Sequence, residues 1–112
     1  MIAEIISLPG YESQVSDLMD EEQRTAMEFF IACGPEDHPL IVGSGGFRKA
    51  RWARPGRGKS AGVRVIYFFI AQPGQVFMAS VYAKSRKQTL SAADRKVLAK
   101  IAGEIKKALK KE

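Results

Sequence analysis

The sequence predicts an α+β fold: a small antiparallel sheet packed against helices, in a single domain over residues 1–112. Two patterns favour this class. Residues 47–83 contain three runs rich in β-branched and aromatic residues, separated by short glycine-containing segments. Residues 11–33 and 91–111 instead repeat apolar residues at helical spacing. A chain of 112 residues has room for one compact core and for no second domain.

The first third of the chain is expected to form a short strand and two helices. Residues 1–8 predict the strand, and the Pro-Gly pair that follows them is a turn signal. Residues 11–33 place apolar side chains on one helical face, which we expect to pack in the core. A break is expected near Asp20, so this segment is predicted to form two helices. The Gly-Pro pair at residues 34–35 ends the helical pattern.

The middle of the chain predicts a three-stranded meander over residues 47–53, 62–71 and 75–83. A tight glycine bend at residues 43–46 is expected to turn the chain into the first of these strands. Because the connections between the strands are short, neighbouring strands are expected to pair in antiparallel fashion. The short N-terminal strand completes the predicted antiparallel sheet.

The chain is predicted to end in one long helix over residues 91–111. Ser91 and Asp94 form the S-x-x-D signature of a capping box. Apolar residues follow at helical spacing, with lysines on the opposite side of the helix. We expect these lysines to form an ordinary solvated face.

The segment "RPGRGKSAG" matches a phosphate-binding P-loop only at its end. Gly58-Lys59-Ser60 supplies the Gly-Lys-Ser of that motif. The first glycine of the motif would fall at Ala53, and the following "AGVRVIYFFIA" predicts a strand where a P-loop needs a helix. We therefore interpret the segment as a glycine-rich hairpin loop that carries cations.

Several functional classes are disfavoured by composition. The N-terminus contains Glu4 and no basic stretch, so it does not predict a signal peptide. The longest uncharged apolar run, Val65–Ala71, is too short to cross a bilayer. One cysteine, Cys33, excludes an internal disulfide, and one histidine, His38, makes a transition-metal site unexpected. A cytosolic protein without a metal or another cofactor is therefore predicted.

The distribution of charge is the most informative property of the sequence. The net charge is +6, but residues 1–40 hold nine acids and one base, Arg24. Residues 41–90 hold ten bases and no acid. Such a stretch cannot neutralise itself, and a polyanion is its natural partner. The alternative is a solvated basic surface that pairs with the acids of the N-terminal part.

Strand alternation predicts that several cations gather on one face of the sheet. Lys49 and Arg51 lie two residues apart on one strand. Arg64 lies in an otherwise apolar strand, where an arginine is costly unless it faces a partner or an open surface. If the strands pair in sequence order, Lys49, Arg51, Arg64 and Lys84 converge on one exposed face.

Further residues are expected at the rim of that face. The hairpin loop adds Arg54, Arg57 and Lys59. Tyr82 shares a face with Lys84 and could stack on a nucleobase. Trp52 alternates to the side opposite Arg51 and is expected to belong to the core.

The ordered set of these motifs resembles the RelE/HigB-type mRNA interferases, which are toxins of type II toxin–antitoxin systems. The resemblance covers most of the chain and is closest over residues 43–87. The segments that carry it are "GSGGFRKARWARPGRGKSAGVRVIYFFIA" and "VYAKSRK", followed by "LSAADRK" at the start of the last helix. Its core is a basic strand, then a glycine-rich basic loop, then "GVRVIY".

The resemblance implies a RelE-like domain that inhibits translation as an endoribonuclease. The enzyme would cut mRNA in the ribosomal A site by attack of a 2′-OH on the adjacent phosphate, without a metal. It would act in the cytoplasm, and its partners would be mRNA, the ribosome with its rRNA, and a cognate antitoxin that carries a DNA-binding domain. The implied catalytic residues are Arg64, which would stabilise charge on the phosphate, with Lys84, Lys49, Arg51 and Lys87. Those implied to bind RNA or the ribosome are Arg48, Arg54, Arg57, Lys59, Tyr82 and Arg86.

The chemistry of this cleavage limits which residues can perform it. The reaction needs a base for the 2′-OH, charge stabilisation at phosphorus and an acid for the 5′-oxygen. Residues 41–90 contain no carboxylate or histidine, but a lysine among other cations has a lowered pKa and can act as a base, while arginine stabilises charge. The best-known branch of the family uses a tyrosine or histidine near its C-terminus, and this chain has neither after Tyr82. Either Lys84, Lys87 or Tyr82 fills that role, or the activity is weak.

Two other hypotheses remain at this point. The same basic sheet could belong to an RNA- or ribosome-binding domain without enzymatic activity. The basic and acidic parts of the chain could also match each other without any nucleic-acid partner, which predicts no salt-dependent binding of RNA.

Overall fold

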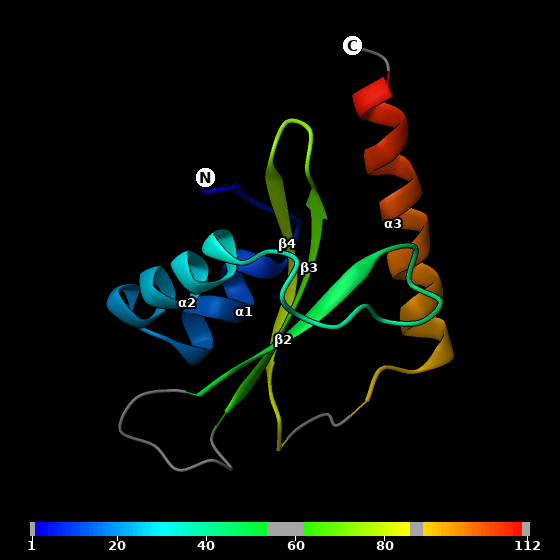
Figure 1. Ribbon diagram of the computed structural model, residues 1–112. Coiled ribbons are helices and arrows are strands. Elements are labelled where there is room, and N and C mark those ends of the chain that lie inside the picture. The colour runs from blue at the N-terminus through cyan, green and yellow to red at the C-terminus, as the bar shows by residue number, and fades with distance from the viewer. Residues whose placement is uncertain (1, 54–61, 86–88, 111–112) are drawn as a thin grey trace.

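The computed structural model describes residues 2–53, 62–85 and 89–110 and contains a four-stranded sheet with helices on both faces (Figure 1). In chain order the elements are β1 (Glu4–Ser7), α1 (Tyr11–Leu18), α2 (Glu21–Cys33), β2 (Phe47–Trp52), β3 (Val63–Ile70), β4 (Gln75–Ala83) and α3 (Ala92–Lys110). The α+β class and the predicted order of elements are confirmed. Within the described ranges, no helix is long and apolar enough to cross a membrane.

The sheet has the strand order β1-β4-β3-β2. β2, β3 and β4 form the predicted antiparallel meander, because short connections make neighbouring strands run in opposite directions. β1 instead pairs with β4 in parallel, so the prediction of a wholly antiparallel sheet is wrong for this strand and the sheet is mixed. Two helices and two strands separate β1 from β4 in the chain, so no hairpin constrains the direction of β1.

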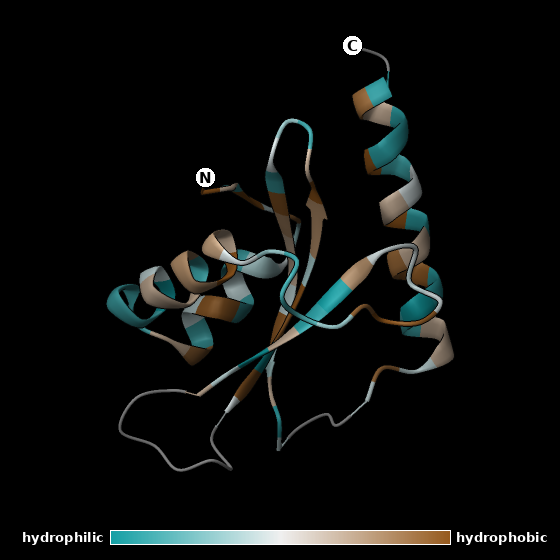
Figure 2. Cartoon of the chain, in the orientation of Figure 1, coloured by the Kyte–Doolittle hydropathy of each residue, from teal (hydrophilic) through white to brown (hydrophobic). Residues whose placement is uncertain are grey.

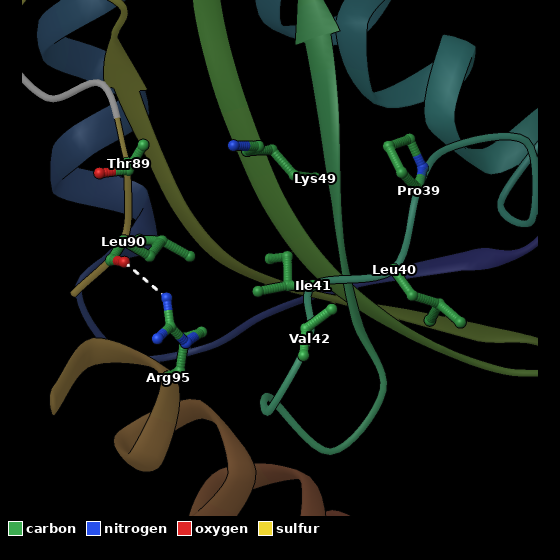
Figure 3. Close-up of a pocket in the computed structure, with 8 residues that line it drawn as sticks. All are labelled: Pro39, Leu40, Ile41, Val42, Lys49, Thr89, Leu90 and Arg95. Carbon is green, nitrogen blue, oxygen red and sulfur yellow. Dashed lines mark hydrogen bonds between the residues drawn. The ribbon is translucent and has the colours of Figure 1, made fainter. Parts of the chain in front are cut away.

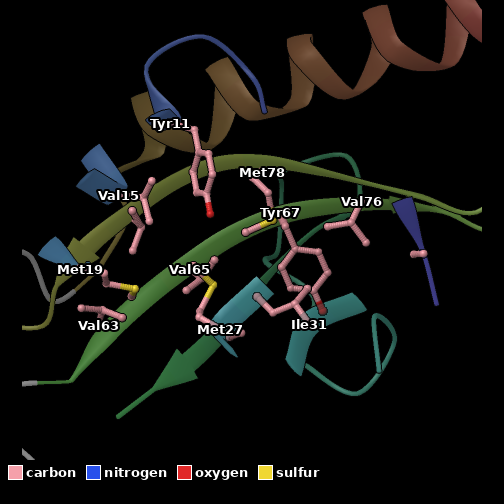
Figure 4. Packing of buried hydrophobic residues seen from close by; sticks show 13 residues of the cluster. Tyr11, Val15, Met19, Met27, Ile31, Val63, Val65, Tyr67, Val76 and Met78 are labelled. Atoms are coloured by element: carbon pink, nitrogen blue, oxygen red, sulfur yellow. The ribbon is translucent and has the colours of Figure 1, made fainter. Parts of the chain in front are cut away.

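Two apolar cores hold the helices to the two faces of the sheet. On one face, α1 and α2 bury a cluster that includes Tyr11, Val15, Met27, Val65 and Met78 (Figure 4). On the other face, α3 packs on a smaller cluster that includes Phe47, Ile66, Phe68, Leu98 and Ala102. Figure 2 shows hydrophilic and hydrophobic residues interspersed along α3, as expected for a helix with one buried side.

Two helices begin where the sequence predicts. Asp20 ends the break between α1 and α2, and its side chain accepts a hydrogen bond from the backbone N–H of Gln23, whose side chain accepts one in return. Ser91 and Asp94 form the predicted capping box, with both hydrogen bonds at 3.0 Å. These caps satisfy N–H groups that have no partner within the helix, and they fix the first residue of each helix.

A network of side-chain hydrogen bonds joins α1 to α2. The Arg24 guanidinium donates to both oxygens of Glu12 at 2.7 Å and to Glu28 at 2.9 Å. The hydroxyl of the buried Tyr11 donates to the same Glu28 oxygen at 2.6 Å. Burial is the main cause that raises the pKa of Tyr11, and the bond to Glu28 adds to it. The hydroxyl therefore stays protonated and holds α2 against the core.

We expect the Glu12 carboxylate to make folding stability depend on pH. Hydrogen bonds from Arg24, and then from Ser7, lower the pKa of Glu12 from 4.5 to about 2. A carboxyl group whose pKa is lower in the folded protein stabilises the fold above its unfolded pKa. This contribution should be lost as the pH falls from about 4.5 to about 2. Thermal unfolding over this range should show Glu12→Gln less stable than the native chain at neutral pH, with the difference vanishing in acid.

A matched control for this prediction is Asp17→Asn, which removes an exposed carboxylate from the same helix. That variant should keep the acid sensitivity of the native chain. If Glu12→Gln and the native chain instead lose stability in parallel over the whole range, the network does not set this pH dependence.

The glycine bend before β2 turns the chain into the strand, as the sequence predicts, and it also packs against α3. Gly43, Gly45 and Gly46 all have positive φ angles, which glycine adopts without strain. The Ser44 hydroxyl donates to the carbonyl of Ile41 at 2.7 Å and accepts from the N–H of Phe47 at 3.0 Å. The bend is therefore closed by its own hydrogen bonds, and α3 rests directly on it.

Replacing Gly45 with alanine should separate α3 from this bend. A Cβ atom at Gly45 would lie 3.1 Å from the Cβ of Ala102 and 3.2 Å from the Cα of Ala99, at a φ of +77°. We expect Gly45→Ala to lower the free energy of unfolding by about 1–3 kcal/mol, measured by urea denaturation.

The control for this substitution is Gly103→Ala in α3, where a Cβ atom meets nothing within 4 Å. Because alanine is the better helix former, that variant should gain about 0.5–1 kcal/mol. Equal effects of the two substitutions would contradict close packing at Gly45.

Candidate nucleic-acid interface

Lys49, Arg51, Arg64 and Lys84 lie on the α3 side of the sheet, and we call these four residues the basic face. Phe47 of β2 packs under α3, so alternation places Lys49 and Arg51 on the same side. The pairing of β2 with β3 sets Arg51 directly opposite Arg64. The register of the sheet therefore brings Arg51 and Arg64 together, as strand alternation predicts.

Three of these residues line a hollow beside Ala53, which follows β2, and Gly62, which precedes β3. Arg51, Arg64 and Lys84 surround a cavity of about 330 Å³ together with Trp52, Ala53 and Gly62. The Lys84 N–H donates to the Gly62 carbonyl at 3.1 Å, which continues the ladder between β3 and β4 beyond their ends. The backbone that carries the three cations is thus held by sheet hydrogen bonds.

The helix α3 leaves this part of the sheet uncovered. α3 contacts the bend at Gly45 and packs on Phe47, at the start of β2. Arg51 lies near the other end of β2, and its side chain is exposed. The basic face is therefore accessible to a ligand beside the helix.

The positive charges of Arg51 and Arg64 repel each other when no anion is bound. Side chains directly opposite each other in an antiparallel pair have Cβ atoms about 4.5–5.5 Å apart, and like charges there are destabilising. Arg51 and Arg64 occupy such positions. Within the described part of the chain, the ion pairs join Arg24 to Glu12 and Glu28, and none joins an N-terminal acid to the basic face. The alternative, in which the acidic N-terminal part neutralises the basic part, would need ion pairs between the two parts. Among the described residues, none of the ion pairs reaches the basic face.

Arg48 lies on the other face of β2 from the basic face. It pairs with Tyr67, which belongs to the core beneath α1 and α2. Its guanidinium donates to the carbonyls of His38 at 2.7 Å and Glu36 at 3.3 Å. These bonds tie the loop before β2 to the strand, so we leave Arg48 out of the interface.

Aromatic residues around the sheet divide between its two sides. Trp52 packs against the core beneath α1 and α2, as expected, with its ring centroid 5.4 Å from that of Phe30. His38 packs on the same ring at 5.1 Å, and burial lowers its pKa. Tyr82 pairs with Arg64 in the register and is half-buried against the core beneath α3. Tyr82 therefore lies beside the basic face, and Trp52 also lines the hollow formed by Arg51, Arg64 and Lys84.

Several residues singled out in the sequence cannot be placed. Arg54, Arg57 and Lys59 of the hairpin loop lie outside the described residues, and so do Arg86 and Lys87. Their assignment to RNA or ribosome binding, and of Lys87 to catalysis, stays a prediction from the sequence.

A second hollow adjoins the basic face and was not foreseen from the sequence. Lys49 and Arg95 line a cavity of about 270 Å³ with the loop 39–42, Thr89 and Leu90 (Figure 3). The spacing in "LSAADRK" predicts where α3 begins, but it contains no signal that the first turn of α3 returns to β2. Only the tertiary fold brings Arg95 and Lys49 to one cavity.

The side chains in the two hollows limit the chemistry that they can perform. Neither set of lining residues includes a carboxylate or an imidazole. Among the residues that the structure describes, no group of three or more histidine, cysteine, aspartate or glutamate side chains could hold a metal ion. The hollows can bind an anion, and their candidate proton-transfer groups are the lysine amines.

Comparison with known proteins gives two findings. A family model described as the RelE toxin of the RelE/RelB toxin–antitoxin system matches residues 15–112. The fold is similar to that of the E. coli toxin RelE, solved in the free state as a variant with two arginine-to-alanine substitutions. The TM-score is 0.57 at 18% sequence identity, and the match covers 79% of this chain and 90% of that chain.

Proposed function

Because the chain belongs to the RelE toxin family of toxin–antitoxin systems, we propose that it is a ribosome-dependent endoribonuclease that cleaves mRNA and stops translation. The observation that supports this most is the pairing of Arg51 with Arg64 beside Lys84, without a carboxylate in their hollow. Three adjacent cations without a counter-charge suit the backbone of a single-stranded polyanion.

In the proposed reaction, the message is cut by its own 2′-hydroxyl. The 2′-oxygen bonds to the adjacent phosphorus while its proton passes to a base, and the bond from phosphorus to the 5′-oxygen breaks. That 5′-oxygen takes up a proton, so the products carry a 2′,3′-cyclic phosphate and a 5′-hydroxyl. We assign Arg64 to stabilise the negative charge that develops on the phosphate, because an arginine stays charged and donates two parallel hydrogen bonds.

The proton transfers are assigned to lysines. Lys84 lines the hollow with Arg64, and Lys49 lies on the same face two residues before Arg51. Tyr82 lies opposite Arg64, but its hydroxyl oxygen is buried, so the lysine amines remain the candidates for proton transfer. Such groups are weak catalysts unless the message is held in a reactive geometry, and the ribosome would supply that alignment.

Two partners follow from this proposal. The ribosome and its mRNA in the cytoplasm are the target. The second partner is a cognate antitoxin that masks the basic face until it is removed. A DNA-binding domain on that antitoxin is part of the proposal as well.

A translating extract tests the proposal directly. Protein added to the extract should stop synthesis of a reporter and shorten its message, while a message without ribosomes stays intact. Synthesis that continues with intact message at saturating protein would refute the proposal.

A second candidate function is RNA or ribosome binding without cleavage. It is favoured by the residues of the two hollows, which include no carboxylate or imidazole, and by the lack of tyrosine and histidine after Tyr82. Under this alternative the protein sediments with ribosomes and the message stays intact.

A further inference from the structure

The hollow beside Lys49 has a chemical character different from that of the basic face. Its wall is the loop 39–42, in which Val42 is 87% exposed and Ile41 points toward Lys49, while Leu40 points away from Arg95 (Figure 3). Arg95 and Lys49 add two positive charges, and Thr89 adds a hydroxyl. A surface that combines apolar groups, cations and a hydroxyl suits a ligand with both a flat apolar part and a negative charge.

Backbone hydrogen bonds hold the wall of this hollow in place. The Ile41 N–H donates to the carbonyl of Phe47 at 2.8 Å, and the Lys49 N–H donates to the carbonyl of Pro39 at 3.0 Å. The loop 39–42 is therefore paired with β2 much as another strand would be. The hollow is formed before any ligand arrives, which lowers the entropic cost of binding.

Arg95 is also fixed in position. Its Nη1 donates to the carbonyl of Leu90 at 2.9 Å, across the start of α3 (Figure 3). A guanidinium held in this way presents a planar surface, and nucleobases stack on such surfaces in RNA-binding proteins. The Thr89 hydroxyl can bond to the edge of a base stacked there.

Lys49 connects the hollow to the basic face. It precedes Arg51 by two residues on one face of β2, which is about 6.6 Å along a strand. A phosphate on Arg51 and Arg64 would therefore leave the neighbouring nucleotide next to Lys49. Lys49 belongs to both surfaces, so one RNA strand can occupy both.

We propose that the hollow between the loop 39–42 and Arg95 binds a nucleobase of single-stranded RNA next to the phosphate on the basic face. The proposal rests on the proposed function for its ligand class. It assigns Arg95 as the stacking surface, Lys49 as the contact to the phosphate of that nucleotide, and Thr89 as a contact to the base edge. A hollow of about 270 Å³ is near the small end of ligand sites, as a single base requires.

The test is an NMR titration of the full chain with 2′-O-methyl hexaribonucleotides, one for each of the four bases. These oligonucleotides cannot be cleaved by 2′-OH attack, so binding is measured without the reaction and without ribosomes. At low salt, at least one hexamer should shift the backbone amides of Ile41, Val42 and Leu90 in a saturable way. Inorganic phosphate at the same charge concentration should leave those amides unshifted.

Two variants complete the test. Val42→Glu places a carboxylate in the wall at a side chain that is 87% exposed, so the fold should be retained. It should weaken binding of the preferred hexamer at least fivefold, and Arg95→Gln should do the same. Lys107→Gln, an exposed residue near the end of α3, is the control for an equal change in net charge and should weaken binding less than twofold.

The outcomes separate this proposal from the proposed function. Amide shifts confined to the basic face, shifts reproduced by phosphate alone, equal effects of Val42→Glu and Lys107→Gln, or no binding of any hexamer at low salt would overturn the base site. Base binding in the hollow without cleavage on ribosomes would leave the site in place and refute the nuclease. Cleavage on ribosomes with no RNA contact at the hollow would support the nuclease and refute the base site.

Discussion

Arg64→Ala is expected to slow mRNA cleavage by about 10²–10³-fold in single-turnover reactions on saturated ribosomes. Arg64 lies in the middle of the basic face, opposite Arg51 on β2 and Tyr82 on β4. Removal of one preorganised donor to a developing negative charge has effects of this size in other enzymes. Saturating protein is essential, because it separates the loss of chemistry from the loss of binding.

The unfolding midpoint of Arg64→Ala shows whether a slower cleavage reflects lost chemistry or a damaged fold. Arg64 faces a like charge at Arg51, so its removal relieves repulsion and should not lower the unfolding midpoint. Arg64→Lys should recover part of the rate, since it keeps the charge without the paired donors. Lys100→Ala on the exposed side of α3 is the control and should cleave at the native rate. A native rate for Arg64→Ala would remove Arg64 from the chemistry.

Binding of single-stranded RNA is expected to fall about 50-fold between 50 and 200 mM salt. Each phosphate neutralised on a single strand contributes about −0.7 to the slope of log affinity against log salt. The four cations of the basic face therefore predict a slope of about −3. Fluorescence anisotropy with a labelled, uncleavable oligonucleotide measures this slope without ribosomes.

The contribution of a single cation can be isolated in the same assay. Arg51→Ala should make the slope shallower by about 0.7, whereas Lys107→Ala should leave it within error. Affinity that does not depend on salt would mean that the basic face is neutralised inside the protein. That result would favour the internal charge match over any nucleic-acid partner.

The features that local rules control could be predicted from the sequence. Asp20 and Ser91 cap their helices through residues three positions away, so the starts of α2 and α3 could be read from short motifs. The short connections of the meander fixed the order of β2, β3 and β4, and that order brings Arg64 beside Arg51. Alternation then placed Trp52 on the core side, as the structure shows.

The features that depend on distant contacts could not be predicted. The parallel direction of β1 is set by its pairing with β4, far along the chain, and no turn motif encodes it. Arg95 reaches the cavity beside Lys49 only because α3 packs on the glycine bend. Arg48 is different: the alternation that unites Lys49 with Arg51 already assigns it to the opposite face of β2, so its separation from the basic face could be predicted from the sequence.

The most direct test of the account is to map the 5′ ends of an mRNA by primer extension after adding the protein to translating ribosomes. The same message without ribosomes, and the Arg64→Ala variant, are measured in parallel. We expect new ends inside codons at the ribosomal A site, absent from the free message and from the variant. Intact message on ribosomes that carry the bound protein, or identical cuts on free RNA, would contradict this expectation.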